Sequence, residues 1–157
     1  MEETLRFIDH YERKACSAQW LAFNRGMAAE LGAGLPPEDL HQLFFRIGER
    51  VAHALPVPPC ATLGELEGHF NAHWDGIDWG FSALREETDG LHIRHACSPL
   101  AMAFGPESTG WSNGFFEGVY QTWFGSQRMP ASLRVLALPT PSQAGPVIEL
   151  LLARAPG

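Results

Sequence analysis

The chain has 157 residues, of which 45% are hydrophobic and 18% are charged, and this is the size and composition of one globular domain with a single core. Its formal net charge is -7 and Lys14 is its only lysine, so it lacks the clustered basic residues that nucleic acid binding requires. No apolar run reaches about eighteen residues and the N-terminus has no signal-peptide pattern, so we expect a cytoplasmic protein without a transmembrane segment.

The first third of the sequence predicts helices. A short one covers residues 5–13, and a longer one covers residues 17–31, where apolar residues recur at steps of three and four before the glycines at 32 and 34. Another begins at Pro36-Pro37, with acidic residues in the first turn, where the helix dipole favours them. The prolines between residues 56 and 59 end this helix, because proline lacks the backbone donor.

Residues 62–74 predict a further helix. Thr62 and Glu65 match a capping box, and Leu66, Phe70 and Trp74 share one side. Apolar and polar residues then alternate on both sides of a turn signal at residues 87–90, which predicts a β-hairpin.

The last third predicts one more helix and one more hairpin. A break at residues 105–110 precedes an unusually aromatic helix over residues 111–123. Strands at 133–138 and 147–153 follow, joined by a Pro- and Gly-rich connection at 139–146. We therefore expect a single α+β domain over residues 1–157: N-terminal helices, then a β-hairpin, the aromatic helix and a second β-hairpin, with the hairpins forming an antiparallel sheet packed by helices on one face.

Histidine and cysteine patterns give weak signals for a metal or a nucleophile. His69 and His73 are four residues apart on a predicted helix, the spacing of a zinc pair, but the sequence supplies no third ligand and lacks the H-E-x-x-H glutamate. His95 and Cys97 share a face of a strand without an orienting residue or an oxyanion-hole motif. The cysteines form no C-x-x-C pair. We predict no metal, no cofactor and no disulfide framework.

Pairs of carboxylates are the remaining candidates for catalysis. Asp75 and Asp78 flank an aromatic corner, and Glu107 and Glu117 lie near the aromatic helix. Acidic residues beside glycines in turns are more often caps than catalysts. The sequence contains no recognisable catalytic constellation, so we expect a protein that is not an enzyme.

Aromatic residues are the distinctive feature of the chain. Burying one tryptophan removes about 150 to 250 Å² from water, which is worth about 4 to 6 kcal/mol, so core or subunit-interface packing is the default role. A sugar-stacking platform is the alternative. The candidates for contact with a sugar or with another subunit are Trp74, Asp78, Trp79, Trp111, Tyr120 and Trp123.

The stretch Trp74-Asp75-Gly76-Ile77-Asp78-Trp79-Gly80-Phe81 is interpreted as a sharp turn from helix to strand. Its glycines allow the turn, its aspartates can bond the local backbone, and its aromatic residues pack beneath. We expect a corner of the fold rather than a sugar-binding surface.

Several of these motifs occur together in an order that resembles a known family. They are Leu55-Pro56-Val57-Pro58-Pro59-Cys60, the corner Gly76-Ile77-Asp78-Trp79-Gly80-Phe81, the hairpin end His95-Ala96-Cys97-Ser98-Pro99, and the helix pattern W-x-x-x-x-x-E-G-x-Y-x-x-W over residues 111–123. Over about residues 38–154 the chain resembles the cellulose synthase operon protein D family. Residues 1–37 fit the family pattern poorly and are interpreted as an N-terminal helical extension.

The resemblance implies a non-catalytic accessory or scaffold subunit of the bacterial cellulose synthase complex, which promotes ordered export and crystalline assembly of cellulose. It also implies a homo-oligomer, a ring-shaped octamer built from dimers, whose partners are components of the synthase complex and, as a further candidate, glucan chains. The acidic net charge favours a basic or proline-rich partner segment, such as one on a scaffold protein.

The order of helix, hairpin, helix and hairpin is also similar to ligand-binding domains of the 4-vinyl-reductase type. That likeness implies a small-molecule or metal sensor with Cys97 and the histidines near its pocket. A likeness of fold alone does not establish a function. The two hypotheses differ in the expected mass: a large closed oligomer for the scaffold, and a monomer or dimer with a ligand for the sensor.

Overall fold

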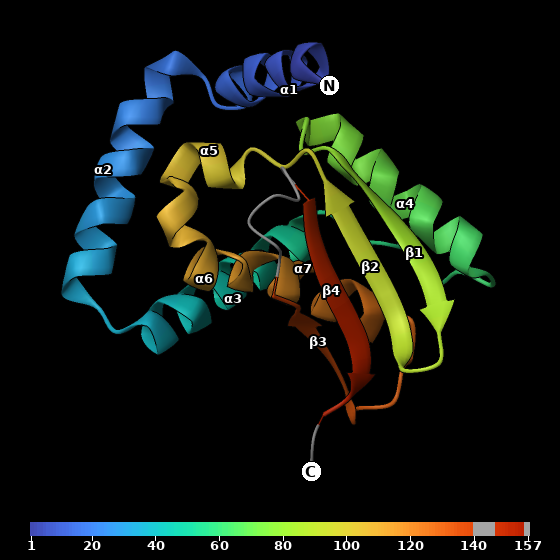
Figure 1. Cartoon of the computed structure of the whole chain (residues 1–157). Helices are drawn as coiled ribbons and strands as arrows, with labels where there is room; N and C mark the ends of the chain where they lie inside the picture. The colour runs from blue at the N-terminus through green and yellow to red at the C-terminus, as the bar shows by residue number, and fades with distance from the viewer. Residues whose placement is uncertain (140–146, 156–157) are drawn as a thin grey trace.

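The computed structural model describes residues 1–139 and 147–155, and it has the predicted α+β architecture (Figure 1). Long helices come first, two β-hairpins form one sheet, and shorter helices lie between the hairpins. The helices are α1 (Glu2–Lys14), α2 (Ala18–Gly34), α3 (Pro37–Ala54), α4 (Leu63–Ile77), α5 (Leu100–Phe104), the 3-10 turn η1 (Pro106–Ser108), α6 (Thr109–Ser112) and α7 (Gly114–Gly125). The strands are β1 (Phe81–Glu87), β2 (Gly90–Ala96), β3 (Leu133–Ala137) and β4 (Val147–Arg154).

The four strands form an antiparallel sheet in the order β1-β2-β4-β3. The second strand of each hairpin lies inside, where Ile93 faces Leu150 and Leu91 faces Leu152. Side chains alternate between the faces of a strand, so these residues share the face that the helices cover. The two hairpins therefore contribute one continuous apolar sheet face to the core. Most of the connection predicted at 139–146 lies outside the described residues.

Helices α3 and α7 approach each other closely because glycines occupy their contact. A Cβ atom added at Gly48 would overlap the backbone carbonyl of Phe115, and one added at Gly118 would overlap the carbonyl of Phe45. This contact places the aromatic residues of α7 between α3 and the sheet. Nine of the twelve residues of α7 are buried, so this helix forms the centre of the core.

The local signals near α4 correspond to observed contacts. Thr62 accepts a hydrogen bond from the Glu65 amide, and Glu65 accepts one from the Ala61 amide, so both residues cap the start of the helix. The sequence places the helix starts and the hairpins within a few residues of their observed bounds.

The aromatic helix is where the structure departs from the prediction. It is divided into α6 and α7 at Asn113, where the backbone stays near helical dihedrals but the Phe116 amide bonds the Asn113 carbonyl in a tighter, 3-10 pattern. Gly114 sits beside this break against the carbonyl of His41. Helix α5 is also absent from the prediction, because five residues are too few to show a period.

Candidate functional site

The predicted aromatic candidates are mainly core residues. Trp74, Tyr120 and Trp123 are buried, so they offer neither a glucan chain nor a second subunit any surface. Trp79 and Trp111 are half-buried; Trp79 stacks on Trp74 with ring centroids 6.2 Å apart, and Trp111 packs against Phe44. Asp78 is exposed but belongs to the turn after α4.

A chain of hydrogen bonds runs through this aromatic core. His95 Nε2 lies 2.8 Å from the Trp79 carbonyl, which can only accept, so Nε2 carries the proton. His95 Nδ1 is then an acceptor, and the Tyr120 hydroxyl donates to it at 2.7 Å. The same hydroxyl accepts from Trp74 Nε1 at 3.1 Å. Tyr120 therefore joins α4, α7 and β2 through one oxygen atom.

Burial sets the protonation of this network. It lowers the pKa of His95 to about 4 and raises the pKa of the Tyr120 phenol, because the charged form of each group would lose its hydration. Both side chains are consequently neutral near pH 7. They hold the core together and are not available as acid or base to a substrate.

The corner after α4 is the predicted turn from helix to strand, although Phe81, expected to pack beneath it, is 54% exposed. Asp78 takes the left-handed conformation with φ of 60°, and the Trp79 amide closes the helix by bonding the Trp74 carbonyl. Gly80 has φ of 82°, and a Cβ there would overlap the Ala96 carbonyl. Only glycine lets β1 begin this close to β2.

The weak zinc pair does not form. His73 hydrogen-bonds the Pro56 carbonyl at 2.9 Å and stacks on Trp123, whereas His69 is exposed. Within residues 1–139 and 147–155, no three His, Cys, Asp or Glu side chains lie together in a way that could hold a metal ion.

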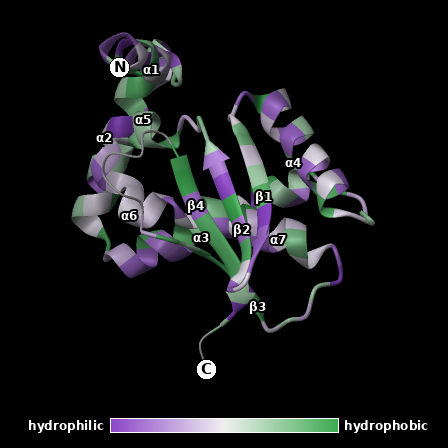
Figure 2. Cartoon of the chain, turned by 45° about the vertical axis from the view of Figure 1, so that its right-hand side comes forward, coloured by the Kyte–Doolittle hydropathy of each residue, from purple (hydrophilic) through white to green (hydrophobic). Residues whose placement is uncertain are grey.

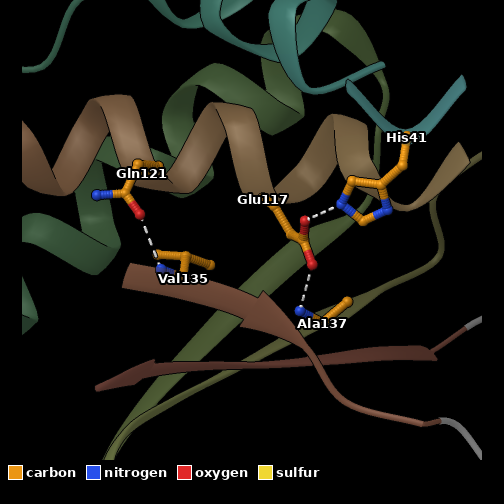
Figure 3. Close-up of polar contacts among 5 residues, drawn as sticks. All are labelled: His41, Glu117, Gln121, Val135 and Ala137. Atoms are coloured by element: carbon orange, nitrogen blue, oxygen red, sulfur yellow. Dashed lines mark hydrogen bonds and ion pairs between the residues drawn. The ribbon is translucent and has the colours of Figure 1, made fainter. Parts of the chain in front are cut away.

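A second polar cluster, not predicted from the sequence, joins α3, α7 and β3 (Figure 3). Glu117 is buried on α7, where one carboxylate oxygen accepts from the Nε2–H of His41 and the other accepts from the Ala137 amide at 2.7 Å. One turn further along α7, the Gln121 side chain accepts from the Val135 amide at 2.8 Å. These bonds satisfy the outer edge of β3, so Glu117 acts as a structural carboxylate.

The opposite edge of the sheet is satisfied in the same way from α4. Asn71 accepts from the Ser82 amide at 2.7 Å and donates to the Ser82 carbonyl at 2.9 Å, and Glu67 accepts from the Leu84 amide. Exposed edge strands invite pairing with other chains. Helix side chains thus occupy edge groups that could otherwise pair with another strand.

The exposed part of His41 faces a shallow open pocket. The pocket has a volume of about 290 Å³ and is lined by Pro37, Glu38, His41, Gln42 and Gly110. Its carboxylate, imidazole and amide can form hydrogen bonds, but His41 is already paired with Glu117. The pocket alone does not define a reaction.

The largest feature missed by sequence reasoning is an apolar surface on the first two helices. Most of the large apolar side chains that stay exposed lie in the first 35 residues, namely Met1, Leu5, Phe7, Ile8, Tyr11, Trp20, Phe23, Met27 and Leu35. Helix α1 lies beyond the end of α2, away from the sheet (Figure 1, Figure 2). We call residues 1–35 the N-terminal arm. In the described residues, no helix is long and apolar enough to cross a membrane.

Comparison with known proteins links the sequence of this chain to one family. A sequence model for the D subunit of cellulose synthase matches residues 6–146, a range that begins upstream of the 38–154 region in which the motifs occur. Two proteins named cellulose synthase operon protein D, both from Komagataeibacter xylinus, are each 30% identical over 89 residues. The match covers 55% of this chain, and the chain spans 57% of the length of each relative. The chain belongs to the family of cellulose synthase D subunits.

Proposed function

We propose that the protein is a non-catalytic accessory subunit of a bacterial cellulose synthase complex, which promotes ordered export and crystalline assembly of cellulose by self-assembling into a scaffold. The family match over residues 6–146 carries this proposal. The proposed assembly is a ring of eight chains built from dimers, with synthase components as partners. The expected cytoplasmic location and the contact with glucan remain predictions.

The arrangement of polar groups supports a role without chemistry. Among the described residues, His95, Tyr120 and Glu117 are buried side chains of types used in catalysis, and each is engaged by neighbours within the fold. The buried serines at 82, 98, 108 and 112 are hydrogen-bonded within the fold as well. Across the described residues, every buried side-chain nitrogen and oxygen has a hydrogen-bond partner. Self-assembly is supported by the N-terminal arm, where nine large apolar side chains are exposed, because exposed apolar patches mark interaction sites.

The sensor hypothesis finds less support. It needs histidine and Cys97 side chains around a ligand, but both ring nitrogens of His95 are already bonded and Cys97 is exposed. No specific observation favours this second function.

The test measures two quantities separately: the rate of cellulose synthesis and the order of the fibrils. In a cellulose-producing host whose own member of this family has been deleted, expression of this chain should restore the alignment and crystallinity of the fibrils, measured by X-ray diffraction. The rate of glucan polymerisation by isolated membranes should stay unchanged. A polymerisation rate that depends on the chain would contradict a non-catalytic role, and unrestored fibril order would contradict the scaffold.

A further inference from the structure

Helix α1 carries an apolar stripe that nothing within the described part of the chain covers. Leu5, Ile8 and Tyr11 recur at steps of three along one side of the helix, and Phe7 lies next to them. Leu5 is 60% exposed and Tyr11 is 73% exposed, although both lie within the helix. A 13-residue helix is only marginally stable in water without a packing partner. The stripe therefore needs a surface to pack against.

The charges of α1 indicate what that surface is. Its first turn carries Glu2 and Glu3, and its last turn carries Arg13 and Lys14. Because both signs are present along the helix, it lacks the strongly basic polar face that draws amphipathic helices to anionic lipid. A membrane surface is therefore disfavoured as the partner.

A second copy of α1 in the antiparallel direction complements both the apolar stripe and the charges at the two ends of the helix. It offers a matching apolar stripe, and it brings the acidic end of one helix beside the basic end of the other. A parallel pair would set acid against acid and base against base, which is unfavourable. The antiparallel pair has a two-fold axis, so the same patch serves both chains, as a closed dimer contact requires.

We propose that α1 pairs antiparallel with α1 of a second copy of this chain and forms one of the contacts that build the assembly. This inference rests on the self-assembly proposed above. A helix of this length spans about 20 Å, too short to supply the roughly 1,600 Å² of a standard interface, so the α1 pair acts together with other contacts.

The experiment uses the full-length chain and measures its mass by light scattering after size exclusion. The basic variant carries Glu2→Lys with Glu3→Lys, and the acidic variant carries Arg13→Glu with Lys14→Glu. Alone, each variant sets like charges together in an antiparallel pair and should need about tenfold higher concentration to associate. Mixing the two variants restores opposite charges at both ends and should restore the mass of the unmodified chain. Mixing does not change the intrinsic helix stability of either variant. Recovery of the mass on mixing therefore reports the contact between the α1 helices.

Asp75→Lys with Glu86→Lys is the matched control, because both acids are exposed and lie outside the arm. It should leave association unchanged. If the basic and acidic variants keep the mass of the unmodified chain, or if mixing them fails to restore it, α1 does not pair in this way, and its stripe contacts another surface such as α2. A monomeric unmodified chain would instead overturn the assembly proposed above, which separates the two failures.

Discussion

At the scale of single residues, the Tyr120 hydroxyl is the polar centre of an aromatic core. In Tyr120→Phe, Trp74 Nε1 loses its acceptor and His95 Nδ1 loses its donor while both stay buried. Unsatisfied buried groups cost about 1 to 3 kcal/mol each, so the loss of two partners should lower the free energy of unfolding by about 2 to 6 kcal/mol in urea titrations. Tyr11→Phe is the control, since that ring is 73% exposed and its change should cost nothing measurable. If Tyr120→Phe were as stable as the unmodified chain, the Tyr120 hydroxyl would not be central to the core.

His95 should make the stability of the protein depend on pH. Its pKa is about 4 in the fold, against an ordinary value of 6.5 in the unfolded chain. Between these values the unfolded chain binds the proton and the folded chain does not, so the contribution of the imidazole is fully present above pH 6.5 and stability is lost as the pH falls toward 4. The difference corresponds to about 3 kcal/mol.

Unfolding curves recorded from pH 7 downward measure this dependence. His95→Gln should flatten the curve between pH 6.5 and 4, while the exposed His69→Gln should leave it as in the unmodified chain. A curve that is already flat in the unmodified chain would show that His95 titrates normally.

At the scale of elements, the contact between α3 and α7 depends on the absence of side chains. Gly48→Ala would place a Cβ against the Phe115 carbonyl, so the helices must separate, at a cost of about 1 to 3 kcal/mol. Gly68→Ala is the matched control, because this glycine also lies within a helix but faces open space. Alanine there should stabilise the chain by up to about 1 kcal/mol, through helix propensity. Thermal unfolding of the two variants should therefore shift in opposite directions, and a shift in the same direction would contradict the close packing.

Local features of these elements are visible in the sequence, because they depend on residues close together in the chain. The Thr62 and Glu65 cap, the turn at 87–90 and the apolar stripe of α3 all belong to this group. The corner after α4 belongs to it as well, since glycine and aspartate tolerate left-handed conformations.

The polar clusters could not be predicted, because their members are distant in sequence. His41 and Glu117 are 76 positions apart, and no spacing rule connects a glutamate on a helix with the edge of a strand such as Ala137. The burial of the aromatic candidates could not be predicted from the sequence either. Sequence alone does not tell whether Trp74 and Trp123 face the core or a partner, and the fold places both inside.

At the scale of the whole molecule, α2 and the sheet both carry large exposed apolar side chains, and we expect α2 rather than the sheet to contribute to the assembly. Trp20 and Phe23 on α2 are 56% and 62% exposed and their rings meet edge to face. Phe81 and Leu136, on outer strands of the sheet, are 54% and 50% exposed. The two pairs are therefore closely matched in exposed fraction but differ in their surroundings.

The surroundings favour α2 as the interface. Its two side chains belong to the N-terminal arm, where other large apolar side chains are also exposed, whereas Phe81 and Leu136 lie on strands at opposite edges of the sheet, with charged residues such as Arg94 and Glu149 between them. Trp20→Gln with Phe23→Gln should lower the mass in solution from a multiple of 17.3 kDa toward that of one chain, while the far-UV circular dichroism stays that of the folded chain. Phe81→Gln with Leu136→Gln should leave the mass unchanged. If instead the sheet variant lowers the mass and the α2 variant does not, the subunit contact lies on the sheet. Both variants remove exposed apolar side chains, but only the removal of side chains buried between chains should dissociate the assembly.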